Sequence, residues 1–276
     1  MKIALVQTVT GSDTMDNFAH LAPLVRDAAA KGASLIVLPE GASQAFEQGR
    51  LDTQAEDLDG AFATNMRDLA GELGVTIVAG MFRPADTVQR GEKTINRVYN
   101  TALITGNGLH EGYDKIHTYD AFNYRESDTV RPGERLVTFE HDGVTVGVAT
   151  CFDIRFPEQF QAFADRGAQV IVVPTSWADG PGKVEQWRIL TAARALDAGV
   201  FIAAAGQSRP DFETKAGEPS GPTGAGHSTV VDPSGVRIAE AGYGPETLVV
   251  DIDPEEAAKQ RKRLPLGQIR ADTTMR

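Results

Sequence analysis

Short apolar runs alternate with segments of helical periodicity along the whole chain. Many of the apolar runs are continuous rather than alternating, which is typical of strands covered on both faces. The predicted strands are 2–7, 34–39, 76–80, 99–105, 144–150, 170–174, 201–205, 228–231 and 247–252. The predicted helices are 14–31, 61–73, 157–166, 184–198 and 254–263. This alternation predicts an α/β protein built around a central sheet.

The pattern also repeats between the two halves of the chain. Gly32–Pro39 reads Gly-Ala-Ser-Leu-Ile-Val-Leu-Pro, and Gly167–Pro174 reads Gly-Ala-Gln-Val-Ile-Val-Val-Pro. Residues 74–80 resemble residues 199–206 in the same way. The spacing differs between the halves, so the duplication is approximate. It predicts two similar sheets packed face to face, each covered by helices on its outer side. Because no low-complexity linker divides the halves, residues 1–276 are predicted to form one domain.

Composition and charge exclude several classes of function. The 276 residues carry a formal net charge of -11, which repels nucleic acids and anionic membranes. No apolar run approaches the roughly 20 residues that a membrane-spanning helix needs. The first residues enter a strand directly and lack the features of a signal peptide, so a cytoplasmic location is expected.

The chain contains one cysteine, Cys151, which excludes an internal disulfide and a zinc site built on several thiolates. It is therefore an inert buried thiol, a reactive thiol or half of an intermolecular bridge. The apolar strand 144–150 runs directly into Cys151, and Pro157 suits the first turn of the following helix. This places the thiol at the carboxyl end of a strand, where open α/β sheets carry their active sites.

Two further side chains stand out at the ends of predicted strands. Glu40 follows the apolar strand 34–39, whereas the repeat places Thr175 at the matching position of the second half. The fold therefore does not require a carboxylate there, and Glu40 is either a surface charge or a functional group. Lys115 lies in the segment 112–117, a predicted hairpin partner of strand 99–105. Alone, such a lysine is usually an exposed charge.

Taken together, three segments resemble the motifs of the nitrilase superfamily of carbon–nitrogen hydrolases, in the order found in that family. They are Leu38-Pro39-Glu40, Tyr113-Asp114-Lys115-Ile116-His117 and Cys151-Phe152-Asp153-Ile154-Arg155-Phe156-Pro157-Glu158. The resemblance covers nearly the whole chain and implies a four-layer αββα sandwich, which agrees with the duplicated halves. It also implies Cys151 as nucleophile, Glu40 as general base, and Lys115 with the backbone N–H of Phe152 as oxyanion donors. Such a reaction needs no metal and no cofactor.

The same resemblance suggests supporting residues. Glu126 matches a second glutamate that many family members carry between the lysine and cysteine motifs. His117 is expected to be structural, and Asp153 is expected to shape the site. Arg155 has the same expected role, or pairs with a glutamate one helical turn later, Glu158. Trp177 either walls the pocket or simply packs in the core.

The residues around the cysteine narrow the class further. Cys-Phe-Asp-Ile-Arg-Phe-Pro-Glu resembles the amidase branch that includes omega-amidases and the amidase of deaminated glutathione. Nitrilases usually place tryptophan where Phe152 stands, and carbamoylases carry paired basic residues where Ile154 and Arg155 stand. The expected function is hydrolysis of a small-molecule amide through a thioester, releasing ammonia or an amine.

Several alternatives remain beside the amidase interpretation. They are an N-carbamoyl hydrolase, a nitrilase, an ammonia-supplying subunit of a partner enzyme, and a non-catalytic binding protein that retains the fold. By resemblance, a homodimer or larger homo-oligomer is expected. The loop 208–224, which contains several Gly and Pro residues, is expected to influence the choice of acyl group.

Overall fold

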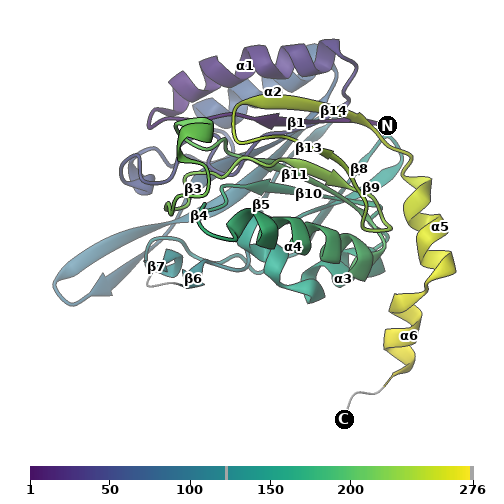
Figure 1. Cartoon of the computed structure of the whole chain (residues 1–276). Helices are drawn as coiled ribbons and strands as arrows, with labels where there is room; N and C mark the ends of the chain where they lie inside the picture. The colour runs from purple at the N-terminus through teal and green to yellow at the C-terminus, as the bar shows by residue number, and fades with distance from the viewer. Residues whose placement is uncertain (122–123, 274–276) are drawn as a thin grey trace.

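The computed structural model describes residues 1–121 and 124–273, and within them two six-stranded sheets pack face to face (Figure 1). The first sheet contains, in spatial order, β14 (Glu246–Asp251), β1 (Lys2–Gln7), β2 (Leu35–Val37), β3 (Thr76–Arg90), β4 (Lys93–Gly106) and β5 (Leu109–Asp114). The second contains β13 (Arg237–Glu240), β12 (Thr229–Val231), β11 (Phe201–Gly206), β10 (Val170–Thr175), β9 (Val144–Val148) and β8 (Val137–His141).

The two sheets have the same topology. In each, three neighbouring strands are parallel: β1, β2 and β3 in the first sheet, and β9, β10 and β11 in the second. On one side of these parallel strands an antiparallel strand is added, β14 in the first sheet and β8 in the second. On the other side two strands are added through antiparallel pairing, β4 and β5 in the first sheet and β12 and β13 in the second. The duplication inferred from the repeated Gly-Ala…Pro segments is therefore present in the architecture.

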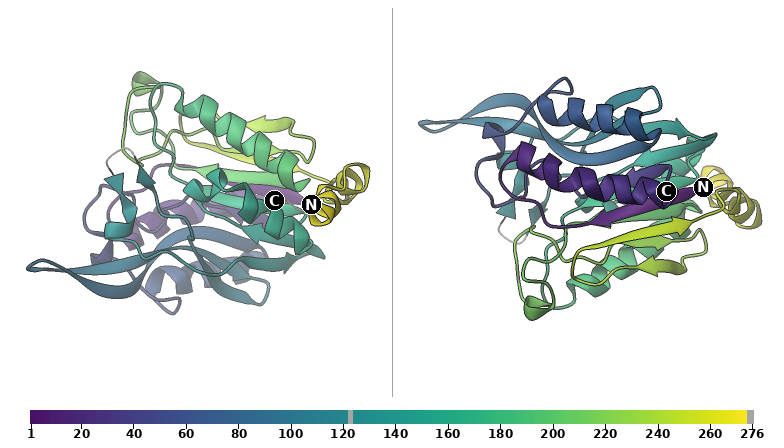
Figure 2. Two further views of the ribbon diagram at one scale, coloured as in Figure 1. Left: turned by 90° about the horizontal axis from the view of Figure 1, so that it is seen from below. Right: turned by 90° about the horizontal axis from the view of Figure 1, so that it is seen from above.

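Helices cover the outer face of each sheet. Figure 2 shows α1 (Thr14–Ala30) and α2 (Ala61–Leu73) side by side over the first sheet, and α3 (Pro157–Asp165) and α4 (Lys183–Ala198) lie together on the second. The four-layer αββα sandwich predicted from the sequence is thus confirmed. Two more helices, α5 (Glu255–Arg263) and α6 (Leu266–Asp272), extend from one end of the molecule (Figure 1). In the described part of the chain, no helix is long and apolar enough to cross a membrane.

Local sequence signals explain where these helices begin and end. The carboxylate of Asp13 accepts hydrogen bonds from the N–H groups of Met15 and Asp16, which satisfies two free donors at the start of α1. Gly74 ends α2 with a φ of 65°, a left-handed conformation that glycine adopts without steric cost. Pro157 occupies the first position of α3, as expected from the sequence.

Three apolar cores hold the layers together. The central core lies between the sheets and contains buried residues of both, such as Leu5, Val37, Val146 and Val172. A second core joins the first sheet to α1 and α2, and a third joins the second sheet to α3 and α4. Because the parallel strands are buried on both faces, their sequences are continuously apolar, and this is why the sequence pattern identified them.

The structure corrects several boundaries and adds elements that the sequence did not reveal. The predicted strands 76–80 and 99–105 are the inner ends of a much longer hairpin formed by β3 and β4, which projects from the body (Figure 1). Its outer part is polar and exposed, so no apolar run marks it. The strands β8 and β13 and the helix α6 were also not predicted. Finally, β5 ends at Asp114, so Lys115 lies just beyond the strand instead of inside it.

Candidate active site

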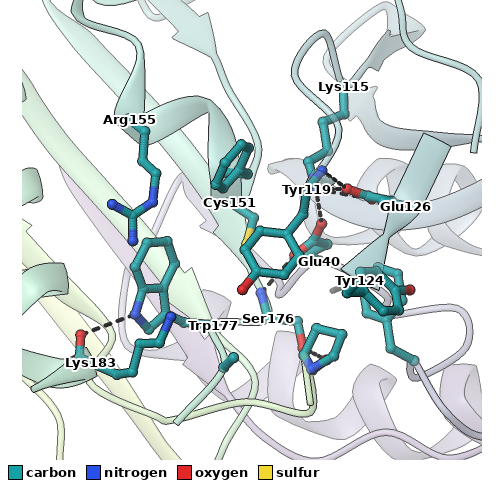
Figure 3. A pocket seen from close by; sticks show the side chains of 14 residues that line it. Glu40, Lys115, Tyr119, Tyr124, Glu126, Cys151, Arg155, Ser176, Trp177 and Lys183 are labelled. Atoms are coloured by element: carbon teal, nitrogen blue, oxygen red, sulfur yellow. Dashed lines mark hydrogen bonds and ion pairs between the residues drawn. The ribbon is translucent and has the colours of Figure 1, made fainter. Parts of the chain in front are cut away.

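Four loops that follow strands meet at one cavity between the two halves of the sandwich. Glu40 follows β2, Lys115 follows β5, Cys151 follows β9, and Ser176 follows β10. All four line the same cavity, and Figure 3 shows the side chains of Glu40, Lys115 and Cys151 directed into it. The duplicated fold therefore brings together three residues that are far apart in the sequence.

Cys151 sits on a strained turn. It has a φ of 46°, a left-handed conformation that is uncommon for a residue with a Cβ atom. It opens the short 3₁₀ helix η3 (Cys151–Arg155), and the carboxylate of Asp153 accepts a hydrogen bond of 2.9 Å from the backbone N–H of Thr150. This hydrogen bond closes the turn around Cys151. It therefore holds the residue in its left-handed conformation just after the end of β9.

A buried ionic cluster stands beside the thiol. The Nζ atom of Lys115 lies 3.1 Å from Oε1 of Glu40, and 3.0 and 2.9 Å from the two carboxylate oxygens of Glu126. Lys115 is 2% exposed, and each glutamate is 1% exposed. Charges buried this deeply persist only when they are paired and hydrogen bonded. Figure 3 shows the ammonium placed between the two carboxylates.

Two groups that the sequence did not identify orient these carboxylates. The side-chain amide of Asn100 donates to Oε1 of Glu40 at 2.7 Å and to Oε1 of Glu126 at 3.2 Å. The backbone N–H of Ser176 donates to the other oxygen of Glu40 at 2.8 Å. The sequence could have indicated Asn100 through its position. A polar amide in the buried end of a strand requires hydrogen-bond partners.

The electrostatics of the cluster fix two protonation states. Burial by itself would lower the pKa of Lys115, but the charges of Glu126 and Glu40 outweigh burial and raise that pKa well above its usual value. Burial and the neighbouring charge of Glu40 raise the pKa of the Cys151 thiol, and the opposing effect of Lys115 is smaller. At neutral pH the lysine is therefore charged and the thiol is protonated, so the thiol requires a base before it can attack.

A second polar network ties the lysine loop to the cysteine turn. The fully buried carboxylate of Asp153 accepts hydrogen bonds from the Tyr113 hydroxyl at 2.6 Å and from the backbone N–H of His117 at 3.0 Å. The Nδ1 atom of His117 also lies 2.8 Å from the same carboxylate, and its ring stacks on Phe156 with centroids 3.6 Å apart. Asp153 and His117 thus lie behind the cavity and position the loops that form it.

The outer wall of the cavity combines aromatic rings with two cations. Phe152 and Trp177 line it, as do two residues that the sequence did not identify, Tyr119 and Tyr124. The Arg155 guanidinium lies 5.1 Å from the Trp177 ring and donates a hydrogen bond of 2.9 Å to a neutral partner, Gln186.

The second cation of this wall is Lys183, which also lines the cavity. Arg155 and Lys183 thus place two positive charges on the same side of the cavity, next to Trp177 (Figure 3). The pairing of Arg155 with Glu158 proposed from the sequence is not formed, since the described residues show no ion pair between these two side chains. The guanidinium instead reaches α4.

Across residues 1–121 and 124–273, no group of three or more His, Cys, Asp or Glu side chains is arranged to hold a metal ion. At its buried end the cavity presents the Cys151 thiol, the carboxylates of Glu40 and Glu126, and the Lys115 ammonium. This set can carry out nucleophilic attack on a carbonyl carbon, proton transfer and stabilisation of an oxyanion.

Comparison with known proteins identifies the family. The family model for carbon–nitrogen hydrolases matches residues 2–262. A hydrolase of Mycobacterium tuberculosis is 43% identical over 270 residues, covering 96% of this chain and 93% of the relative. The mouse omega-amidase is 32% identical over 281 residues, covering 98% of this chain and 95% of the relative.

Solved structures agree with this assignment. The Saccharomyces cerevisiae protein Nit3, of the nitrilase superfamily, superposes with a TM-score of 0.78 at 26% identity, covering 96% of this chain and 94% of its own. A mutant amidase from Nesterenkonia sp. AN1, with acrylamide added to its active site cysteine, superposes with a TM-score of 0.71 at 26% identity, covering 96% of this chain and 98% of its own. The chain therefore belongs to the carbon–nitrogen hydrolase family and is a carbon–nitrogen hydrolase of the amidase type.

Proposed function

We propose that the protein hydrolyses a small-molecule amide through a thioester on Cys151. The observation that carries the proposal is the position of the Lys115 ammonium, held between Glu40 and Glu126 in the cavity that contains the thiol. A charged donor fixed next to a nucleophile and a carboxylate base supplies each group that acyl transfer from nitrogen to sulfur requires.

In the acylation step, a carboxylate oxygen of Glu40 takes the proton of the Cys151 thiol while Sγ forms a bond to the amide carbonyl carbon. The carbonyl electron pair moves to oxygen, and the ammonium of Lys115 and the backbone N–H of Phe152 stabilise the resulting oxyanion. When the intermediate collapses, the carbon–nitrogen bond breaks. The proton held on Glu40 passes to the leaving nitrogen, which departs as ammonia or an amine.

In the second step, Glu40 removes a proton from a water molecule that attacks the thioester carbonyl. The carbon–sulfur bond breaks, the carboxylic acid leaves, and the proton on Glu40 returns to the Cys151 sulfur. Glu126 does not take part in these transfers. Its two hydrogen bonds to Lys115 keep the ammonium charged and directed at the oxyanion.

The cavity wall favours an acyl group that carries a carboxylate. Arg155 and Lys183 place two cations on one side of the cavity, and the hydrogen-bond partner of Arg155 is the neutral amide of Gln186. Burial and the nearby charge of Arg155 lower the pKa of Lys183, which indicates that the two cations influence each other. An anion placed between them would relieve this repulsion. The relatives that are omega-amidases give independent support.

The reaction partner in this proposal is a small amide, and the protein acts as a homodimer or larger homo-oligomer in the cytoplasm. We expect neither a nucleic acid nor a membrane to be a partner. The formal net charge of -11 supports the exclusion of polyanionic partners.

The decisive experiment incubates the purified protein with succinamate, butyramide, an N-carbamoyl amino acid and an aliphatic nitrile. Ammonia release and the intact mass of the protein are measured. We expect ammonia from succinamate, an acyl adduct on Cys151, and slower turnover of butyramide because it lacks the carboxylate. The matched control is Cys151→Ala, which should give neither signal. Faster turnover of the nitrile would favour a nitrilase, and faster turnover of the carbamoyl compound would favour a carbamoylase. The proposal would be overturned if none of the four compounds gave ammonia or an adduct.

A further inference from the structure

A buried ion pair lies immediately behind one wall of the cavity. Asp179 is 2% exposed and Arg209 is 5% exposed, and Oδ2 of Asp179 lies 3.3 Å from Nε of Arg209. Neither residue lines the cavity. The pair joins the segment that follows β10, which carries Ser176 and Trp177, to the loop 208–224.

Asp179 holds this loop through its backbone as well as its side chain. Its N–H donates to the Ser220 hydroxyl at 3.0 Å, and its carbonyl accepts from the Ser220 N–H at 3.2 Å. Its carboxylate accepts from the N–H of Gly217 at 2.8 Å and from the N–H of Gly180 at 2.8 Å. Oδ1 of Asp179 thus accepts a hydrogen bond from the next residue of its own segment, and Oδ2 contacts the loop 208–224.

Arg209 completes the attachment from the other side. Its guanidinium donates to the carbonyl oxygens of Lys215 and Glu218, at 3.4 and 3.5 Å, so it spans the interior of the loop. Its backbone N–H donates to the carbonyl of Tyr243 at 2.9 Å, which anchors the start of the loop to the body. Apart from the short 3₁₀ helix η4 (Phe212–Lys215), this loop has no regular secondary structure among its described residues. These polar contacts therefore largely determine its shape.

The loop in turn forms part of the cavity. Pro222 lines it next to Trp177 and Ala178, and the Ser176 hydroxyl donates to the Pro222 carbonyl at 2.7 Å. Ser176 is also the residue whose backbone N–H binds Glu40. A shift of the loop would move the wall formed by Pro222 directly. It would reach Glu40 only through the Ser176 contact, and Glu40 would keep its hydrogen bonds from Lys115 and Asn100.

We infer that Asp179 and Arg209 are positioning residues, and that their buried pair fixes the wall formed by Trp177, Ala178 and Pro222 against which the acyl group binds. The inference rests on the proposed function, since it assigns this wall to the acyl pocket of an amidase. Loosening the pair weakens substrate binding and leaves the chemical step intact.

The test compares Asp179→Asn with the wild type. Asparagine offers one acceptor oxygen, so it cannot bind the N–H groups of Gly180 and Gly217 together with Arg209. We expect KM for the preferred amide to rise by about fivefold or more while kcat changes by less than about twofold. This pattern results when a change weakens the binding of substrate and transition state equally. The matched control is Asp86→Asn, which breaks an Asp–Arg pair with Arg97 outside the cavity and should leave KM unchanged.

A second measurement does not depend on amidase activity. Because the chain has one cysteine, mass gain from iodoacetamide reports on Cys151 alone. For Asp179→Asn we expect a half-saturating iodoacetamide concentration about fivefold higher than for the wild type, with an unchanged limiting rate. If the wild type hydrolyses no amide, the proposed function fails, and alkylation still decides whether the pair positions the wall.

Rescue by charge distinguishes positioning from a general effect on folding. Arg209→Lys keeps the positive charge and should raise KM less than Arg209→Gln. Asp179→Asn combined with Arg209→Gln should raise KM by less than the product of the two single effects, because both changes remove the same ion pair. The inference is overturned if KM and the half-saturating concentration stay within about twofold of wild type. It is also overturned if kcat and the limiting rate fall by as large a factor as KM and the half-saturating concentration rise. If Asp179→Asn does not fold, the two Arg209 variants decide by the same criteria.

Discussion

The carboxylate of Glu126 holds the Lys115 ammonium with both of its oxygens, at 3.0 and 2.9 Å. The carboxylate of Glu40 reaches the same ammonium with one oxygen, at 3.1 Å. The second oxygen of Glu40 accepts a hydrogen bond from the Ser176 N–H instead. In the proposed mechanism this asymmetry matches two different tasks: Glu126 fixes the cation, and Glu40 transfers the proton.

Replacing the sulfur tests the nucleophile. Cys151→Ala should abolish amide turnover, because no other group in the cavity can form the thioester. The free energy of unfolding should change by less than about 1 kcal/mol, since one small buried group is lost. Ammonia release and calorimetry measure the two effects. Residual turnover by pure Cys151→Ala would show that the nucleophile is misassigned.

Removing the cation tests the oxyanion site. Lys115→Ala should lower kcat/KM by at least about 100-fold, which corresponds to roughly 3 kcal/mol or more of transition-state stabilisation. It should also destabilise the fold, because two buried carboxylates lose their partner. Steady-state kinetics and thermal melting report on the two effects. A loss of only about tenfold would mean that Lys115 does not face the oxyanion.

Neutralising Glu126 separates its role from that of Glu40. Glu126→Gln should lower kcat by about 10-fold to 100-fold, because the ammonium loses the charge that orients it. The matched control is Asp128→Asn in the same short turn, which pairs with Arg90 and Arg125 outside the cavity and should retain activity. Equal activity of Glu126→Gln and wild type would show that the bidentate contact has no catalytic consequence.

The pKa of the thiol offers a test without substrate. Burial and, next to it, the charge of Glu40 raise the pKa of Cys151, so Glu40→Gln should lower that pKa while it abolishes turnover. The removal of a nearby negative charge favours the thiolate, and Lys115 remains to stabilise it. The pH dependence of alkylation by iodoacetamide measures this on the sole cysteine. An unchanged or higher pKa in Glu40→Gln would contradict the arrangement.

Stability should depend on pH through a histidine far from the cavity. His141 is buried between the sheets, with ring nitrogens 2.9 Å from the Ser34 hydroxyl and 3.0 Å from the Thr76 hydroxyl. Burial lowers its pKa, and the nearby carboxylate of Asp142 opposes this only in part.

The folded state therefore favours the neutral ring of His141. Its contribution to stability is complete above the unfolded-state pKa of about 6.5 and is lost as the pH falls below that value. Urea unfolding of the wild type and His141→Gln at about pH 5 and about pH 7.5 checks this. The variant should show a smaller difference between the two pH values. An equal difference in both proteins would assign the pH dependence to other groups.

The sequence by itself determined the parallel strands and the identity of the reactive groups. Continuously apolar runs such as 170–174 are dictated by burial on both faces, and the Gly-Ala…Pro repeat predicted two equivalent sheets. Glu40, Lys115 and Cys151 could be proposed because each follows an apolar strand or stands in a motif that resembles the family's.

Tertiary structure decided what a linear pattern cannot encode. The role of Asn100 depends on two glutamates that are distant in sequence, and the partner of Arg155 is Gln186 on another helix and not the adjacent Glu158. The outer part of the β3–β4 hairpin is exposed and polar, so pairing between strands defines it, not burial. Local sequence fixes burial and periodicity, whereas hydrogen bonds between distant loops are fixed only when the two sheets pack together.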